Sequence, residues 1–217
     1  MKGWNTMYYP HYQYVYSIPV TSAYVRILHA SPDAPAVDIY ANNVLIAQNL
    51  AYRGFTQYLS LAPATYRILV YPTGTRTTPV IDTQVNIAPN GMYTIAAAGL
   101  LQNIEAVVVP DTAAILPPNR TQLKFVHLSP NAPAVDITLP NGTVLFPNIS
   151  FGQISNNITV VPANYTLQAR IAGTNQIVLT VPNTLIRGNR YYTVYAVGLV
   201  DANPPLQALI ALDKASY

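Results

Sequence analysis

The stretch His29-Ala-Ser-Pro-Asp-Ala-Pro-Ala-Val-Asp-Ile39 occurs a second time as His127-Leu-Ser-Pro-Asn-Ala-Pro-Ala-Val-Asp-Ile137. The two copies start 98 positions apart (127 − 29), and nine of their eleven positions are identical. Similarity at a fixed long spacing marks a repeated structural unit. We therefore expect the 217-residue chain to contain two copies of one domain. Each copy, at about 100 residues, is long enough to bury its own core.

The repeat divides the chain into four expected parts: an aromatic N-terminal arm, a first domain, a proline-containing linker and a second domain. Their expected bounds are residues 1–21, 22–112, 113–122 and 123–217. Two adjacent prolines, Pro117 and Pro118, mark the linker. Prolines favour an extended, semi-rigid connection, so we expect the two domains to be held apart by a short spacer.

Both expected domains have the composition of β-sheet proteins. Short β-branched or aromatic runs alternate with Pro, Gly and Asn, and no segment sustains an apolar period of 3.6 residues. The spacing of the turn residues indicates about seven strands in each copy. We predict an all-β fold: two tandem immunoglobulin-like antiparallel β-sandwich domains with an N-terminal extended arm.

The composition excludes several classes of function. Only 9% of residues are charged, against roughly 25% in ordinary soluble domains, and a charge-poor surface favours association. The net charge of +3 is scattered singly, so we expect no nucleic-acid partner. No window of about 20 residues is continuously apolar, so we expect no membrane insertion. The absence of cysteine excludes disulfides, cysteine-ligated zinc and thiol catalysis.

Two further segments recur with the motif. Pro63-Ala-Thr-Tyr66 matches Pro162-Ala-Asn-Tyr165, and a Tyr-Thr-hydrophobic strand closes each copy. Together these segments resemble the domain-of-unknown-function family 4397, over roughly residues 23–110 and 122–213. The family occurs in bacterial and archaeal secreted or surface proteins, often as tandem copies. The resemblance implies a β-sandwich and an extracellular or envelope setting, and it implies no reaction.

The repeated histidines, His29 and His127, are the first candidates for chemistry. Strand alternation places His29 on the same face as Val25 and Ile27, which is the expected core face. A buried imidazole there donates a hydrogen bond to the following loop. Metal ligation is the alternative, because imidazole and carboxylate together suit transition metals. The acid of the first motif is an amide in the second, which weakens a shared metal site, so we expect no metal and no cofactor.

The remaining polar residues of the motif predict turn chemistry. The loop is too short for its serine to converge with the histidine and an aspartate in a catalytic triad, so we expect no catalytic residues and no enzyme. Proline fixes φ, while serine and aspartate cap nearby amides. The final aspartate of each motif is expected to pair with Arg26 or Lys124 on an adjacent strand. The predicted structural motif residues are His29, Ser31, Asp33, Asp38, His127, Ser129, Asn131 and Asp136.

The unrepeated arm is the predicted functional element. Its aromatic residues are Trp4, Tyr8, Tyr9, Tyr12, Tyr14 and Tyr16. An extended segment cannot satisfy its own backbone, so we expect the arm to pair with a sheet edge, in its own chain or in a neighbour's. In the leading hypothesis residues 5–20 add to a sheet edge of the next subunit. A disordered arm is the alternative, but disordered segments are normally poor in aromatic residues. The hypothesis is a self-assembling cell- or spore-surface protein whose partner is itself, in an extracellular location.

The second hypothesis is an extracellular module that binds carbohydrate or another surface polymer, with a surface polysaccharide as partner. Exposed aromatic rings stack on sugar rings while their polar ends remain hydrated. The expected platform consists of Tyr52, Tyr58, Tyr71, Tyr191 and Tyr195.

Overall fold

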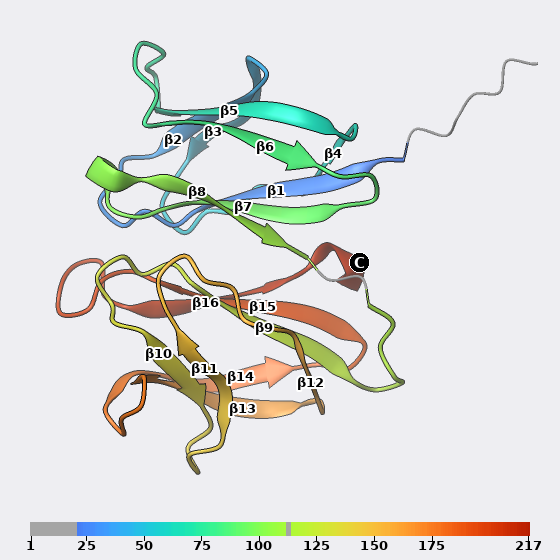
Figure 1. The fold of residues 1–217 in the computed structure, drawn as a ribbon, viewed down its shortest axis with the longest axis vertical. Helices are drawn as coiled ribbons and strands as arrows, with labels where there is room; N and C mark the ends of the chain where they lie inside the picture. Colours follow the sequence, from blue (N-terminus) through green and yellow to red (C-terminus); the bar gives the residue numbers. More distant parts are fainter. Residues whose placement is uncertain (1–20, 112–113) are drawn as a thin grey trace, which may run out of the picture.

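The protein is described by a computed structural model that covers residues 21–111 and 114–217. Its secondary structure is almost entirely β-strand, so the all-β prediction is confirmed. The described residues form four sheets of four strands each (Figure 1). Within these residues, no helix is long and apolar enough to cross a membrane.

The N-terminal half consists of the first eight strands, which form two sheets. One sheet has the order β4-β1-β7-β8 and the other β3-β2-β5-β6. The strands are β1 (Ala23–His29), β2 (Val37–Ala41), β3 (Val44–Leu50), β4 (Leu59–Leu61), β5 (Ala64–Pro72), β6 (Ile81–Ile87), β7 (Met92–Ala98) and β8 (Glu105–Pro110). A short 3-10 helix, η1 (Leu101–Asn103), precedes β8.

The C-terminal half repeats this arrangement of strands. Its sheets have the orders β12-β9-β15-β16 and β11-β10-β13-β14, which correspond position by position to those of the N-terminal half. The strands are β9 (Thr121–His127), β10 (Val135–Thr138), β11 (Val144–Ile149), β12 (Ile158–Val160), β13 (Ala163–Ile171), β14 (Ile177–Ile186), β15 (Arg190–Val197) and β16 (Gln207–Leu212). The 3-10 helix η2 (Lys214–Ser216) follows β16.

Three details of the fold prediction were wrong. Each half has eight strands rather than seven, and the first of the second set begins at Thr121, inside the expected linker. The sheets are also not purely antiparallel, because β1 pairs with β7, and β9 with β15, in parallel. These partners are separated by five intervening strands, so no tight hairpin forces them to run in opposite directions.

The four sheets stack as layers with three apolar interfaces between them (Figure 1). One core lies between the two sheets of the N-terminal half and contains Val25, Ile39 and Val70. A matching core in the C-terminal half contains Phe125 and Ile137. The third core joins the halves through the sheets that contain β1 and β9. The junction core consists of Leu28, Ala30, Ala96, Ala98, Val107, Val109, Val126, Leu128, Tyr195 and Val197.

The junction core explains why the central strands are buried on both faces. In β1, the core-facing Val25 and Ile27 are buried, but so are Arg26 and Leu28 on the opposite face. Alternation within one strand predicts one buried and one solvated face. The second face of β1 is covered by the other half of the chain, which no local pattern reveals.

Glycine is required where β7 and β15 end. Gly99 has φ +97°, and an added Cβ would lie 2.6 Å from the carbonyl oxygen of Asn103. Gly198 has φ +90° and would place a Cβ still closer to the carbonyl oxygen of Pro205. Both obstacles are backbone atoms, which cannot rotate away. The close approach of the following loop therefore depends on the missing side chain.

Replacing Gly99 with alanine should lower the free energy of unfolding by about 1–3 kcal/mol, because the left-handed conformation and the backbone clash are both unfavourable. Urea denaturation followed by circular dichroism measures the change. Gly74→Ala is the matched control, since Gly74 has φ +79° but nothing within 4 Å of an added Cβ. Equal losses at the two positions would show that the contact with Asn103 contributes nothing.

Candidate functional site

The structure places both repeated histidines inside the molecule. His29 and His127 are fully buried at the ends of β1 and β9. Each imidazole Nε2 donates to a carbonyl oxygen of the following loop, at 2.9 Å to Pro35 and 3.1 Å to Pro133. A carbonyl oxygen can only accept, so Nε2 carries the proton in both rings. Burial lowers the pKa of both histidines, partly opposed by these hydrogen bonds.

The acid-to-amide difference between the motifs has a structural reason. Asp33 accepts a hydrogen bond from the amide of Leu101 at 2.8 Å. Its counterpart Asn131 exchanges two hydrogen bonds with the backbone of Val200, one donated at 3.0 Å and one accepted at 2.8 Å. An amide side chain can do both, whereas a carboxylate only accepts. Each residue therefore ties the motif loop to the loop that follows β7 or β15.

The two motif serines have different partners. Ser31 donates to Asp33 at 3.4 Å, and Ser129 donates to the carbonyl oxygen of Gly198 at 2.6 Å. Both serine side chains are fully buried. Through these contacts each serine holds its motif loop, to Asp33 in one copy and to Gly198 in the other.

The expected pairing of Asp38 and Asp136 with Arg26 and Lys124 was wrong. Asp38 accepts from the amides of Asn49 at 2.7 Å and Gly74 at 3.1 Å, and these bonds, led by that of Asn49, lower its pKa. Asp136 accepts from the corresponding amides of Asn148 and Gly173. Both aspartates lie in the outer sheets, on strands that are not adjacent to β1 or β9, so they cannot reach the basic residues.

The motif residues form no metal centre in the described part of the chain, where no group of three or more histidine, cysteine, aspartate or glutamate side chains is close enough to hold an ion. The two motifs also lie in separate halves. Most of their hydrogen bonds go to the backbone of neighbouring loops. We interpret each motif as a structural corner.

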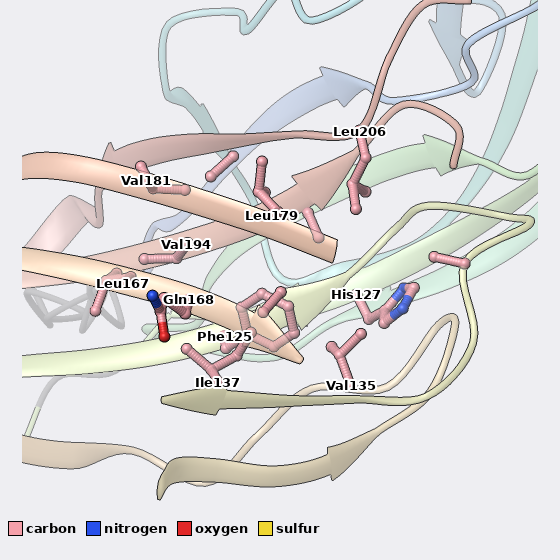
Figure 2. Close-up of a pocket in the computed structure, with 14 residues that line it drawn as sticks. Phe125, His127, Val135, Ile137, Leu167, Gln168, Leu179, Val181, Val194 and Leu206 are labelled. Carbon is pink, nitrogen blue, oxygen red and sulfur yellow. The ribbon is translucent and has the colours of Figure 1, made fainter. Parts of the chain in front are cut away.

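An apolar cavity lies between the two sheets of the C-terminal half (Figure 2). It is lined mainly by aliphatic side chains, including Leu167 and Val194, together with the rings of Phe125 and His127. Its volume is about 20 Å³, room for about one water molecule. A substrate would have to displace core side chains to enter, so the cavity is a gap in the packing between the sheets rather than a binding pocket.

The predicted tyrosine platform is not assembled. Tyr71 and Tyr195 are buried in different layers of the molecule. The hydroxyls of Tyr58 and Tyr191 donate to Asp111 and to the carbonyl oxygen of Ala114, respectively. Tyr52 is half-buried, and its ring makes a T-shaped contact with that of His29. A sugar ring needs a flat exposed aromatic face, and these five side chains do not share one.

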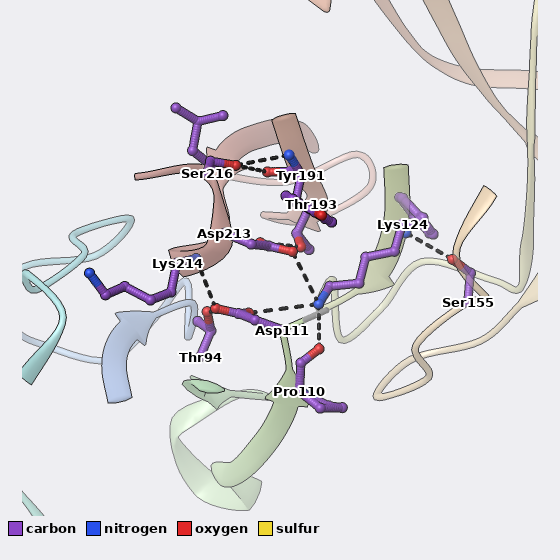
Figure 3. A network of polar contacts seen from close by, with 12 residues as sticks. Thr94, Pro110, Asp111, Lys124, Ser155, Tyr191, Thr193, Asp213, Lys214 and Ser216 are labelled. Carbon is purple, nitrogen blue, oxygen red and sulfur yellow. Dashed lines mark hydrogen bonds and ion pairs between the residues drawn. The ribbon is translucent and has the colours of Figure 1, made fainter. Parts of the chain in front are cut away.

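A charged network that no sequence pattern predicted lies at the junction of the halves (Figure 3). Arg26 donates to the carbonyl oxygen of Leu212 at 2.8 Å and lies 3.6 Å from Asp213. Lys124 makes the corresponding contacts, donating to the carbonyl oxygen of Pro110 and lying 3.7 Å from Asp111. Lys124 and Asp213 are also 3.4 Å apart. Two cations and two carboxylates are thus buried together.

Two threonines and a tyrosine complete this network. Thr94 donates to Asp111 at 3.5 Å, and Thr193 donates to Asp213 at 2.7 Å. Burial, with the neighbouring charge of Asp111, raises the pKa of Tyr58, so its hydroxyl stays protonated and donates. The contacts have an approximate two-fold symmetry within one chain. The sequence does contain a signal that could have revealed the network: a basic residue, Arg26 or Lys124, stands three positions before each motif histidine.

An open groove of about 630 Å³ runs beside the network, where the two halves meet. One wall is the consecutive segment Phe55–Tyr58, which leads into β4. The other wall is formed by Ile210, Ala211 and Leu212 of β16, with Lys214 and Tyr217 beyond. Consecutive strand residues point to opposite faces, so a groove that touches three in a row lies at the strand edge.

The groove contains groups that bind aromatic side chains. The ammonium group of Lys214 lies 4.6 Å from the ring centre of Tyr24 and 6.0 Å from that of Tyr217. Tyr24 is the second residue of β1, three positions after the expected end of the arm at residue 21. The arm residues Trp4, Tyr8, Tyr9, Tyr12, Tyr14 and Tyr16 lie outside the described residues.

Comparison with known proteins adds a family and two distant structural likenesses. No curated protein matches the chain. A structure described as the Bacillus anthracis TIE protein is 13% identical with a TM-score of 0.25; the match covers 76% of this chain and 32% of that one. A structure of CBMbc (family CBM26) from Eubacterium rectale Amy13K in complex with maltoheptaose is 10% identical with a TM-score of 0.26; the match covers 88% of this chain and 96% of that one.

These scores are too low to assign a shared fold, and the chain spans about a third of the length of the first structure. The family comparison is more specific. The model of a domain of unknown function, DUF4397, matches residues 23–138, a range that includes both occurrences of the repeated motif. More than half of the sequence is matched, and the chain therefore belongs to the DUF4397 family.

Proposed function

We propose that this protein is a non-catalytic structural subunit that assembles with copies of itself on the outside of a cell or spore. In this proposal the two halves are tandem immunoglobulin-like sandwich domains. Residues 5–20 of one subunit add as a strand to β16 of the next. The corresponding strand orders of the halves and the low charge of the chain support this reading.

The observation that carries the proposal is that β16 is an unprotected sheet edge. Natural proteins protect edge strands by charge, proline, bulges or shortness. Among the eight edge strands of the described residues, seven have such a device. Two edge strands carry a charged residue: Asp82 in β6 and Glu105 in β8. Two others, β4 and β12, are only three residues long. The remaining three, β3, β11 and β14, have a bulge or another shift of register. β16 has no charge, no proline and a regular register.

The chemistry of the groove beside β16 suits the arm. A strand added at this edge would lie along the groove and direct alternate side chains toward its walls. The walls offer the ring of Phe55 and the ammonium group of Lys214. Both are favourable partners for tyrosine, through aromatic packing and cation–π attraction. The arm supplies Tyr12, Tyr14 and Tyr16 at alternate positions.

Donation of the arm to another subunit would produce an open assembly. Each subunit would carry one donor segment and one acceptor edge at different places. Such head-to-tail contacts generate filaments or layers unless the rotation between subunits closes a ring.

The test compares the assembly of four proteins by negative-stain microscopy and light scattering. The wild type should form filaments or layers. The variant without residues 1–20 should be a folded monomer, and so should Ile210→Lys, which places a charge on the β16 edge. Leu185→Lys is the matched control, because Leu185 is an exposed leucine on the β14 edge. It should assemble like the wild type.

A synthetic peptide of residues 1–20 adds an independent measurement. It should bind the truncated protein at a ratio of one to one, and the Ile210→Lys exchange should weaken that binding at least tenfold. Assembly of the truncated variant would show that the arm is not the connector. A monomeric wild type at every concentration would refute the proposed function.

A further inference from the structure

Lys124 is a buried primary amine that faces two buried carboxyl groups. Its side chain is 2% exposed, and those of Asp111 and Asp213 are 0% and 2% exposed. The Nζ atom lies 3.4 Å from an oxygen of Asp213 and 3.7 Å from an oxygen of Asp111. Figure 3 shows the ammonium group between the two carboxylates. Water, which would keep amine and acid apart as solvated ions, is largely excluded.

The corresponding position in the N-terminal half holds Arg26. Arg26 and Lys124 make matching contacts, and either residue type would serve to neutralise the carboxylates. A guanidinium remains protonated in proteins, whereas a lysine amine loses its proton readily when buried. Only the C-terminal half therefore presents a nitrogen that can become a nucleophile.

We propose that Lys124 and Asp213 join spontaneously through an isopeptide bond, with Asp111 as the group that moves the proton. A proton first passes from the ammonium group to Asp213, which gives a neutral amine and a neutral carboxylic acid. The Nζ atom attacks Cγ of Asp213 and a C–N bond forms. Asp111 takes a proton from the nitrogen and returns it to the departing hydroxyl. The C–O bond breaks, one water molecule leaves, and no oxidant or other reactant is needed.

The surroundings of Asp213 favour each part of this step. Burial raises the pKa of Asp213, which favours the protonated acid. Its Oδ1 atom accepts a hydrogen bond from Thr193 at 2.7 Å and faces Arg26 at 3.6 Å. These donors stabilise the negative charge that develops on the oxygen during attack. The Oδ2 atom, which is nearer to Lys124, is left to depart as water.

The bond would close the C-terminal half covalently. Lys124 lies on β9, the first strand of that half, and Asp213 directly follows β16, its last strand. A cross-link between distant positions restricts the unfolded chain, as a disulfide does. The chain has no cysteine, so an isopeptide bond would supply the staple that disulfides provide elsewhere.

Intact-mass spectrometry of the denatured protein tests the proposal, and the mass can be read whether or not a variant folds. The wild type should be lighter than its sequence mass by one water molecule. Lys124→Arg should have its full mass. Asp111→Asn keeps Lys124 and Asp213 but removes the proton carrier. At least nine-tenths of its molecules should therefore have the full sequence mass. Lys214→Arg, at a nearby lysine, should be lighter by one water molecule, like the wild type.

Tryptic peptide mapping locates the bond. A branched peptide that contains both Lys124 and Asp213 is the expected product. A wild type with the full sequence mass would overturn the proposal. A loss of water that persists in Lys124→Arg would also overturn it, because it would arise from dehydration of another residue.

Discussion

Replacing Arg26 with methionine should lower the free energy of unfolding by about 3–5 kcal/mol, one of the largest effects of any single substitution in this chain. Methionine keeps much of the length of the side chain but removes its charge. The variant leaves one buried negative charge without a cation, whether Lys124 and Asp213 form an ion pair or are joined as an amide, because the carboxylate of Asp111 remains at 0% exposure. It also removes the donors to Thr94 and to the carbonyl oxygen of Leu212.

Chemical denaturation of the wild type and variant measures this difference. The matched control is Arg67→Met, because Arg67 pairs with Asp82 at 2.5 Å on the surface, with the two side chains 59% and 41% exposed. Ion pairs on the surface contribute little to stability because solvent screens them, so the same exchange should have little effect there. If the two exchanges destabilise the protein equally, the junction charges are solvated and the halves do not pack as described.

Acidification from pH 7 to pH 5 should destabilise the protein through its two buried histidines. Burial lowers the pKa of His29 and His127 in the folded chain, whereas histidine in an unfolded chain titrates near 6.5. Below that pH the unfolded state binds protons that the folded state does not. The contribution of the two histidines to the free energy of unfolding is therefore complete above about pH 6.5. It decreases as the pH falls, by up to about 1.4 kcal/mol per pH unit for each histidine.

The double variant His29→Gln and His127→Gln isolates this contribution. Its stability at pH 7.5 should be lower than that of the wild type, because two loop hydrogen bonds are lost, but its decrease on acidification should be shallower. The comparison is needed because Asp213, wherever it is not joined to Lys124, has a pKa raised by burial and contributes a slope of the opposite sign. Parallel pH profiles for the two proteins would show that the histidines are solvated or already charged in the folded state.

The alternation of apolar and polar residues along short segments was sufficient to predict the strands and the direction of several side chains. The alternation of Val25, Ile27 and His29 indicated a core-facing row, and all three are buried. In β13, Leu167 and Ala169 follow the same alternation, and both are buried while the intervening Gln168 is partly exposed. Such predictions succeed because the side chains of a strand alternate with a period of two residues, whatever the strand packs against.

Pairings between distant segments were not predictable in the same way. Arg26 was expected to meet Asp38, but it lies near Asp213, 187 positions away in sequence (213 − 26). Tyr195 was expected on an exposed platform but is completely buried at the junction. In both cases the deciding contact comes from the other half of the chain. Sequence periodicity reports which face a residue is on, and not what covers that face.

The sequence by itself determined the repeat, the all-β fold and the inward direction of the motif histidines, because these depend on identity between segments and on alternation within a strand. The tertiary structure alone decided that the two halves pack face to face, that Arg26 and Lys124 are buried with Asp111 and Asp213, and that β16 borders an open groove. These features depend on how one sheet covers another, and burial of both faces of the central sheets is set by contacts between residues far apart in the chain.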